Sequence, residues 1–174
     1  IYKNRDAVQD GSWYLAEPVW VTAENAGMRS AAFYFVGTEA DVGGVRPTYW
    51  RNFDADVLPG ARVDTVLDWL SLPVSERPRL MTLYFEHVDS TGHWYGPGSP
   101  ENLETIRKID TQLGRLLDGI EALPHGESVS VLIVSDHGHS PYSDGEPSIV
   151  EQWGDLDGAK TVGKGTFVYL QFDE

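Results

Sequence analysis

The sequence contains no cysteine, which excludes disulfides and thiolate metal sites. Any metal would therefore be held by oxygen and nitrogen ligands. No apolar run reaches the roughly 18 residues that a membrane-spanning helix needs, and the chain has neither a signal-peptide pattern nor an Asn-x-Ser/Thr sequon. Because the chain begins at Ile1 rather than at an initiator methionine, these absences leave its compartment open.

Basic residues are also scarce, since 13 Lys and Arg stand against 27 Asp and Glu and the formal net charge is −14. A chain without a basic face is poorly suited to bind a long nucleic acid. A small phosphate ester remains compatible with this charge, because bound dications would supply the positive charge that side chains lack. The length of 174 residues fits one domain or part of a larger one.

Strand-like and helix-like patterns alternate along the chain. Apolar runs predict strands at residues 30–36, 80–86, 129–135 and 166–172. Periodic apolar positions and capping residues predict helices at 18–26, 63–70, 100–122 and 148–153, with Ser99 as an N-cap. Residues 1–17 and 37–60 are expected to be irregular. This order predicts an α/β fold with a mainly parallel sheet and helices on both faces.

Two carboxylate–imidazole pairs follow two of the predicted strands. Asp89 and His93 come after residues 80–86, and Asp136 and His137 follow residues 129–135. Ligands of such sheets bind beyond the carboxyl ends of the strands, so both pairs are expected at one rim. Carboxylates and imidazoles bind zinc, and a catalytic zinc usually has three protein ligands and one open position. We therefore predict two metal ions with about two ligands each, although a polar loop and a capping turn are the structural alternatives.

The other histidines receive less weight. His87, at the end of a strand, is expected to be a packed or hydrogen-bonded residue, and His125 to be a solvated loop residue. His139 would be able to reach the site or a substrate phosphate, but we favour a structural role because neighbouring ligands already occupy its turn.

Aromatic residues are frequent in the segments that lead to the predicted rim. Core packing is the ordinary role of such side chains. An aromatic slot beside two metal ions would, however, suit a nucleobase or an aryl ester. The residues concerned are Phe35, Tyr49, Trp50, Tyr84, Trp94 and Tyr95.

A series of short motifs extends over nearly the whole chain: Pro18-Val-Trp-Val-Thr-Ala-Glu24, Gly37-Thr-Glu39, Arg46-Pro-Thr48, Thr82-Leu-Tyr-Phe85, Asp89-Ser-Thr-Gly-His93, Tyr95-Gly-Pro97 and Ser135-Asp-His-Gly138. In this order the motifs resemble the nucleotide pyrophosphatase/phosphodiesterase family, the type I phosphodiesterases of the alkaline phosphatase superfamily. The resemblance is more specific than either metal pair alone. It implies an incomplete alkaline-phosphatase-like fold.

The resemblance also implies hydrolysis of phosphodiester or pyrophosphate bonds in nucleotides or related small phosphate esters. Two Zn²⁺ ions are implied: Asp89 and His93 would bind one, completed by a downstream histidine, and Asp136 and His137 the other, completed by an upstream aspartate. An upstream threonine would be the nucleophile and would carry a covalent intermediate. By the same resemblance, substrate-facing positions are taken by Phe35, Trp50 and Tyr84. His139 stands where the family commonly has a neighbouring methionine.

The sequence lacks a histidine after His139 and lacks an aspartate-bearing strand before Ser30. We therefore expect residues 1–174 to be an internal part of a catalytic domain that binds metal weakly and hydrolyses little by itself. One alternative is a phosphomonoesterase or phosphonate hydrolase with the same metal pairs. Another is a noncatalytic metal-binding module that has lost the nucleophile. The family resemblance suggests a secreted or periplasmic location.

Overall fold

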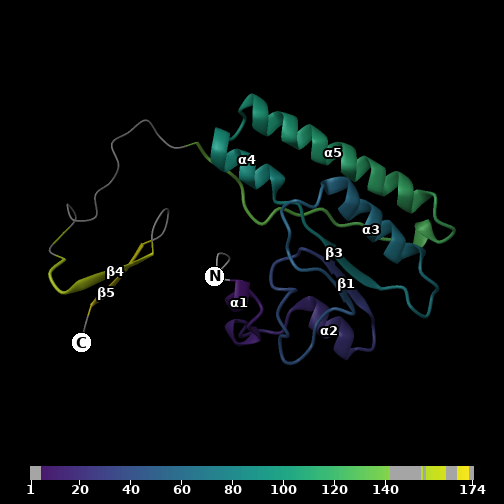
Figure 1. The fold of residues 1–174 in the computed structure, drawn as a ribbon, viewed down its shortest axis with the longest axis horizontal. Coiled ribbons are helices and arrows are strands. Elements are labelled where there is room, and N and C mark those ends of the chain that lie inside the picture. The colour runs from purple at the N-terminus through teal and green to yellow at the C-terminus, as the bar shows by residue number, and fades with distance from the viewer. Residues whose placement is uncertain (1–4, 142–153, 155, 164–167, 173–174) are drawn as a thin grey trace. The chain divides into compact units, whose positions relative to one another are not determined.

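The computed structural model describes residues 5–141, 154, 156–163 and 168–172. The chain divides into two compact units, Ile1–Ser140 and Pro141–Glu174. Figure 1 shows the ribbon of both units. None of the described helices is both long and apolar enough to cross a membrane.

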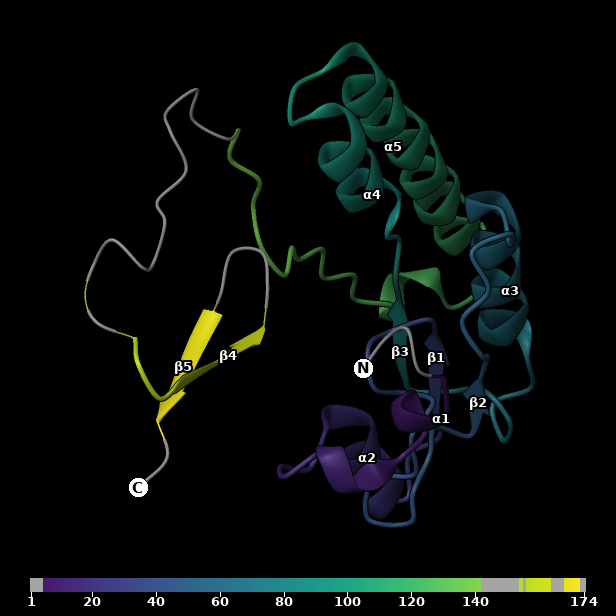
Figure 2. The ribbon, with the colours of Figure 1, turned by 60° about the vertical axis from the view of Figure 1, so that its left-hand side comes forward.

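The first unit is built on a parallel sheet of three strands, β1 (Ser30–Phe33), β2 (Tyr49–Trp50) and β3 (Leu80–Leu83). Their order is β2-β1-β3, so β1 lies in the middle, as Figure 2 shows. The register pairs Ala31 with Tyr49 and with Met81. The expected parallel sheet is confirmed, although β2 lies in a segment for which we expected no regular element.

The strands predicted at residues 30–36 and 80–86 both end earlier than expected. β1 stops at Phe33 because Tyr34 has a φ of 61°, a left-handed conformation that turns the chain out of the sheet. β3 stops at Leu83, and its edge position leaves all four of its residues only half buried. The chain then enters a helix that starts at His87.

The predicted helices of the first unit are present with shifted bounds. Ser99 caps the longest one, because its Oγ accepts a hydrogen bond from the Asn102 N–H at 3.2 Å. The helix after β3, α4, was not predicted because its residues were interpreted as a ligand loop. The helices are α1 (Arg5–Val8), α2 (Val19–Asn25), α3 (Pro59–Ser71), α4 (His87–Tyr95) and α5 (Pro100–Glu121), with short 3-10 helices at Gly11–Trp13 and Gly126–Ser128.

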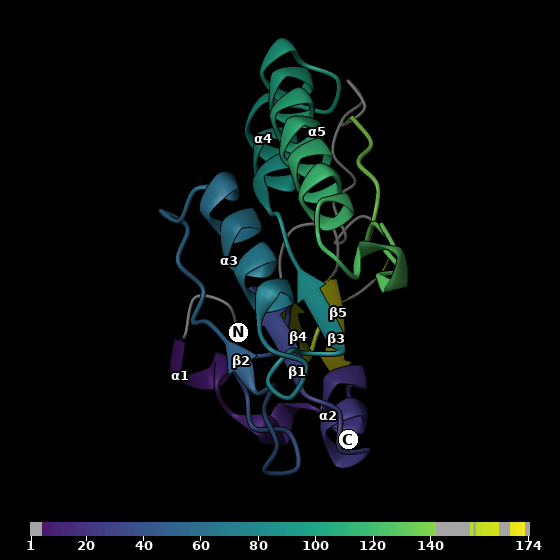
Figure 3. The same ribbon diagram turned by 90° about the vertical axis from the view of Figure 1, so that its right-hand side faces the viewer.

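Helices cover both faces of the sheet, as predicted. Ala31 and Phe33 point to one face and pack with the apolar stripes of α3 and α5. The other face meets α2, whose Trp20 and Val21 form a second cluster that includes Leu80 of β3. Side chains alternate between the two faces of a strand, so neighbouring residues of β1 and β3 serve different layers. Figure 3 shows α2 apart from α3 and α5.

The predicted strand at residues 129–135 is wrong. These residues have no regular secondary structure, and Leu132, Ile133 and Val134 are 86%, 64% and 70% exposed. A wholly apolar strand is stable only when other layers cover both of its faces. Here Val129 alone packs against the α3–α5 core, so the rest of the segment lacks the burial that would hold it in the sheet.

The second unit contains an antiparallel hairpin of β4 (Ala159–Gly163) and β5 (Val168–Phe172). β5 confirms most of the predicted last strand, whose first two residues lie outside the described part. β4 was not predicted. The predicted helix at 148–153 also lies outside the described residues.

Candidate metal centre

Asp89 and His93 lie one turn apart on α4, the helix that follows β3. This spacing of four residues places both side chains on the same face of the helix. Nε2 of His93 lies 3.5 Å from Oδ1 of Asp89. Oδ1 of Asp89 is buried and has no hydrogen-bond partner among the described residues, although its side chain as a whole is 35% exposed. A buried carboxylate oxygen without a donor is poorly stabilised unless a cation binds it.

His137, in the irregular segment after α5, contacts both the Asp89 carboxylate and the neighbouring Asp136. Nε2 of His137 lies 3.5 Å from Oδ1 of Asp89 and 3.6 Å from Oδ2 of Asp136. The backbone N–H of His137 donates to Oδ1 of Asp136 at 3.1 Å, and the Ser135 hydroxyl donates to the His137 carbonyl at 2.6 Å. The two carboxylate–imidazole pairs therefore meet at His137, although the strand predicted to carry the second pair is not formed.

The hydrogen bond made by Nδ1, the other ring nitrogen of His137, is typical of a histidine that binds a metal through Nε2. Nδ1 lies 3.1 Å from the Gly138 carbonyl, to which its N–H donates. In the neutral ring this leaves the Nε2 lone pair directed at the two carboxylates, which is the arrangement of many metal-binding histidines. The Gly138 carbonyl, with the charges of Asp136 and Asp89, raises the pKa of His137 above its ordinary value.

His139 is also part of this cluster, although we expected a structural role for it from the sequence. Its Nε2 lies 3.3 Å from Oδ1 of Asp89, and its side chain is 21% exposed. The His139 ring meets those of His93 and His137 edge-on, with centroid distances of 5.1 and 5.4 Å. The signal available in the sequence was the spacing of two residues between His137 and His139, which allows both to reach one site from an extended backbone.

The donor set fits a divalent metal of the zinc type. With bonds of about 2.0–2.1 Å, neighbouring ligand atoms of a tetrahedral zinc are separated by about 3.3–3.4 Å. The distances from Oδ1 of Asp89 to Nε2 of His93 and to Nε2 of His139, 3.5 and 3.3 Å, are close to this separation. Ligand atoms of Asp89, His93 and His139 all lie within 4.8 Å of one another. Carboxylate oxygen and imidazole nitrogen are also ligands that zinc prefers.

A buried arginine fixes the junction between β3 and α4. Arg62 of α3 is fully buried and donates to both carboxylate oxygens of Glu86, the residue before α4. It also donates to the Tyr84 carbonyl at 2.9 Å. Burial alone would raise the pKa of Glu86, but the hydrogen bonds and charge of Arg62 outweigh it, so this pKa lies below its ordinary value. The start of the helix that carries Asp89 is thereby held against α3.

A cavity of about 440 Å³ lies beside the same part of α4. His87 lines it and is half-buried, in agreement with the packed role expected for this residue. Burial lowers the pKa of His87, although the charge of Glu86 opposes the shift. The cavity's other lining residues are Phe53, Ala55, Glu86, Ser90, Thr91 and Thr105.

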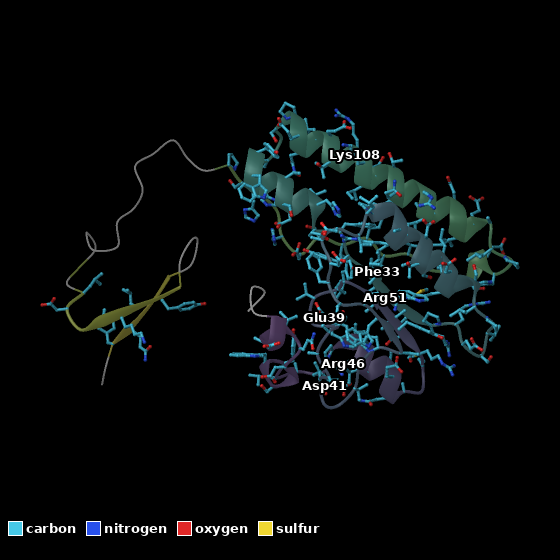
Figure 4. All side chains as sticks on the ribbon, viewed as in Figure 1. Phe33, Glu39, Asp41, Arg46, Arg51 and Lys108 are labelled. Atoms are coloured by element: carbon cyan, nitrogen blue, oxygen red, sulfur yellow. The ribbon has the colours of Figure 1, made fainter. Side chains whose placement is uncertain are left out.

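The three aromatic residues expected to face a substrate lie in different surroundings. Phe35 packs edge-on against Trp20 at 6.2 Å, in the cluster formed by α2. The guanidinium of Arg46, labelled in Figure 4, lies over the ring of Trp50 at 5.2 Å. Tyr84 packs against the α3–α5 core. The contacts described for these rings are structural, and their role toward a substrate stays a prediction.

Comparison with known proteins places these motifs in a family. Residues 2–174 match the family model described as type I phosphodiesterase/nucleotide pyrophosphatase. Human ectonucleotide pyrophosphatase/phosphodiesterase family member 1 is 38% identical over 126 residues, which are 72% of this chain and 14% of the human protein. Venom phosphodiesterase CdcPDE of Crotalus durissus collilineatus is 37% identical over 127 residues, or 73% of this chain and 15% of that protein.

The fold has a close counterpart among solved structures. Murine ectonucleotide pyrophosphatase/phosphodiesterase 5 superposes with a TM-score of 0.80 and 24% identity, over 95% of this chain and 44% of the murine chain. An inactive variant of the same murine protein in complex with AMP matches 65% of this chain and 30% of its own, with a TM-score of 0.60 and 30% identity. The chain thus has the incomplete alkaline-phosphatase-like α/β fold that the motifs predicted. It belongs to the type I phosphodiesterase/nucleotide pyrophosphatase family.

Proposed function

We propose that residues 1–174 are a partial catalytic domain that holds the metal ligands of a zinc-dependent hydrolase. Its substrates would be phosphodiester or pyrophosphate bonds in nucleotides or related small phosphate esters. The observation that carries this proposal is the convergence of three imidazole nitrogens on Oδ1 of Asp89. Family membership supports the reaction class, because the relatives are named as phosphodiesterases and pyrophosphatases.

Two zinc ions would be held by the two pairs. Asp89 and His93 supply ligands for one, and Asp136 and His137 supply ligands for the other. When bound, zinc offers Lewis-acid stabilisation of phosphoryl oxygens and lowers the pKa of bound water. The hydrogen bond from His137 Nδ1 to the Gly138 carbonyl keeps its Nε2 available as a ligand. In a chain with a formal net charge of −14, cations at this rim would also attract an anionic substrate.

The chain spans 14–15% of the length of the two relatives described above. We accordingly assign the nucleophilic threonine, and the covalent intermediate on it, to the complete protein. Phe35, Trp50 and Tyr84 are proposed to face the substrate there. Aromatic rings of this kind stack well on a nucleobase, and the AMP complex of the murine relative is in keeping with a nucleotide substrate. A secreted or periplasmic location is proposed on the same resemblance.

The complete reading frame that contains these residues provides the test. We expect the purified, zinc-loaded protein to hydrolyse bis(p-nitrophenyl) phosphate faster than p-nitrophenyl phosphate. The variants Asp89→Asn and Asp136→Asn should each lose at least about a hundredfold in kcat/KM, because each removes a charged metal ligand from a site whose charge stabilisation drives the reaction. The exposed Glu121→Gln, far along α5, is the control and should keep the wild-type rate.

The other functional classes give different results in this assay. A preference for the monoester would favour a phosphomonoesterase and contradict the diesterase proposal. Zinc binding without hydrolysis of either ester would indicate a noncatalytic module and would also overturn it.

A further inference from the structure

We propose that Arg46 is a positioning residue for Trp50 and holds the indole ring in the orientation in which it stacks on the base of a nucleotide. This inference rests on the proposed function, in which Trp50 faces the substrate, and adds a residue that acts through it. Arg46 lies in the segment before β2, and Trp50 is the last residue of that strand.

Trp50 differs from the other two aromatic residues that are proposed to face the substrate. Phe35 and Tyr84 both pack against apolar clusters of the first unit. Trp50 is half-buried but belongs to neither cluster, and no ring-to-ring contact among the described residues involves it. A large aromatic ring outside the core keeps apolar surface that a planar ligand can cover.

The guanidinium of Arg46 covers one face of this ring. Its carbon atom lies 5.2 Å from the centre of the Trp50 ring, within the range of a cation–π contact. The opposite face of the indole is the one that a base would stack on. Because the contact restricts rotation of the indole, the ring is ordered before a substrate binds and less entropy is lost on binding.

Arg46 is itself fixed to a buried part of the chain. Its Nε donates to the Glu39 carbonyl at 3.1 Å, and both residues are labelled in Figure 4. Glu39 is 6% exposed, and Thr38 and Ala40 on either side of it are fully buried. The guanidinium is planar and rigid, so a hydrogen bond at Nε also restricts the plane that faces the indole.

A tight turn places Arg46 beside the segment that precedes the turn. Gly43 and Gly44 have φ of 63° and 78°, conformations that residues with a side chain rarely adopt. Val42 and Val45 form an antiparallel bridge across this turn, and Arg46 follows directly. The local sequence thus accounts for the return of Arg46 toward the buried backbone that anchors it.

The backbone of β2 is held by contacts that do not involve Arg46. Trp50 is paired with Ala32 of β1 in the register of the sheet. The Glu24 carboxylate accepts hydrogen bonds from the N–H and the hydroxyl of Thr48, at 2.8 and 2.9 Å. Removal of the Arg46 side chain should therefore free the indole ring and leave the strand in place.

A positioning role can be separated from simple attraction of the substrate's phosphate by the positive charge of Arg46. Attraction of phosphate strengthens the binding of every phosphate ester. Positioning of the indole ring matters only for a ligand that has a base. AMP and ribose 5-phosphate differ in the base, so their dissociation constants distinguish the two roles.

Isothermal titration calorimetry with the zinc-loaded complete protein provides the test. We expect Arg46→Ala to raise the Kd of AMP by about three- to tenfold, the size of a cation–π contact. The Kd of ribose 5-phosphate should stay unchanged, which also shows that the variant is folded. In hydrolysis of the p-nitrophenyl ester of thymidine 5′-monophosphate, KM should rise by a similar factor while kcat stays the same, because binding of the base is equal in the ground and transition states.

Three further variants show whether Arg46 acts through the ring. In a Trp50→Ala background, Arg46→Ala should have no further effect on AMP affinity, since residues that act as one unit are not additive. Arg46→Lys keeps the charge but not the planar group, so it should recover only part of the loss. Arg107→Ala removes an arginine of α5 that is 71% exposed and pairs with Glu104, and as the control it should bind AMP like the wild type.

Equal losses for AMP and ribose 5-phosphate would overturn the inference and assign Arg46 to the phosphate. It is also overturned if Arg46→Ala binds AMP like the wild type, if the effects of Arg46→Ala and Trp50→Ala add, or if the wild type binds AMP no more tightly than ribose 5-phosphate. AMP binding that depends on Arg46, in a protein that hydrolyses no phosphate ester, would support the inference and contradict the proposed function.

Discussion

The guanidinium of Arg62 binds both carboxylate oxygens of Glu86, with distances of 2.6 Å from Nη1 to Oε2 and 2.8 Å from Nη2 to Oε1. The guanidinium carbon also lies 4.8 Å from the centre of the Tyr34 ring, the residue whose positive φ ends β1. One side chain therefore connects α3, the end of the central strand and the residue that precedes α4. This connection fixes the start of α4, the helix that carries Asp89.

Removal of the Arg62 side chain should strongly destabilise the first unit. Arg62→Ala leaves Glu86 without its counter-charge, and breaking a buried ion pair from one side costs about 3–5 kcal/mol. Arg62→Lys keeps the charge but cannot bind both oxygens in the same geometry, so it should lose part of that amount. Urea unfolding monitored by tryptophan fluorescence measures both changes.

The ion pair between Arg115 and Asp64 provides the matched comparison, since it also joins α5 to α3 but both side chains are about half exposed. Exposed pairs contribute about 0–1 kcal/mol. Arg115→Ala should therefore change the free energy of unfolding far less than Arg62→Ala. Equal losses would show that burial of the Arg62 pair is unimportant.

Glu24 should make stability depend on pH in the acidic range. Burial would raise its pKa, but hydrogen bonds from Ser30 and Thr48 outweigh burial and leave the pKa below its ordinary value of 4.5. Because the folded-state pKa is depressed, the stabilisation is complete above the ordinary value and is lost as the pH falls through the folded-state pKa. The free energy of unfolding, measured by urea titration from pH 6 to pH 3, should show this loss.

Glu24→Gln should remove most of this pH dependence and lower stability at pH 6 by about 1–3 kcal/mol, because a neutral amide oxygen accepts weaker hydrogen bonds than a carboxylate oxygen. The backbone and hydroxyl groups of Ser30 and Thr48 are the donors, at 2.7 to 3.0 Å. Glu121→Gln, at the exposed end of α5, is the control. A pH profile unchanged in Glu24→Gln would contradict the assignment.

The regular elements were predictable from the sequence where periodicity and capping agree. α5 follows from an apolar stripe that begins after Ser99, and the parallel order of β1 and β3 follows from the helix between them. α4 was missed because it is short and contains Gly92 and two histidines, residues with weak helix propensity. Its stability comes from tertiary contacts such as Arg62 with Glu86, which no local pattern contains.

The candidate site was predictable in its residues and only partly in its geometry. We expected Asp89 and His137 to lie close together because each follows a predicted strand. Their atoms lie 3.5 Å apart, although no strand forms at residues 129–135. The contribution of His139 depends on how an irregular backbone turns past Gly138, which residue types alone do not specify. The same limit applies to residues 129–135, where apolar character predicted a strand but the covering layers that would stabilise it are missing.

Two glycines of α5 should respond in opposite ways to alanine. A Cβ at Gly114 would have no atom within 4 Å, so Gly114→Ala should stabilise the helix by up to about 1 kcal/mol. At Gly119 the new Cβ would lie 2.6 Å from Cδ1 of Leu67 on α3. Gly119→Ala should therefore destabilise the protein by about 1 kcal/mol, because overpacking of the α3–α5 contact exceeds the gain in helix propensity. Thermal unfolding of both variants checks the signs, and a stabilised Gly119→Ala would contradict the observed packing.

Asn102 joins the first turn of α5 to the middle of α4. Its side chain is almost fully buried, and its Nδ2 donates to the Val88 carbonyl at 3.0 Å and to the Thr91 hydroxyl at 3.1 Å. Its Oδ1 accepts from the Gly98 N–H at 3.2 Å. Val88 precedes Asp89, so this amide group holds the helix immediately beside a predicted metal ligand without contacting the metal site itself.

Asn102→Ala should lower the free energy of unfolding by about 1–3 kcal/mol, since it removes the three hydrogen bonds that this side chain makes to Val88, Thr91 and Gly98. Zn²⁺ affinity should fall as well, because a less firmly held α4 no longer keeps Asp89 and His93 in one arrangement. Asn102→Asp retains the acceptor for Gly98 but cannot donate to Val88, so it should weaken Zn²⁺ binding too. Asn25→Ala removes an exposed amide whose Nδ2 donates to Glu17 at 3.2 Å, and as the control it should change stability by less than about 0.5 kcal/mol. If Asn102→Asp bound Zn²⁺ like the wild type, donation to α4 would not position the ligands.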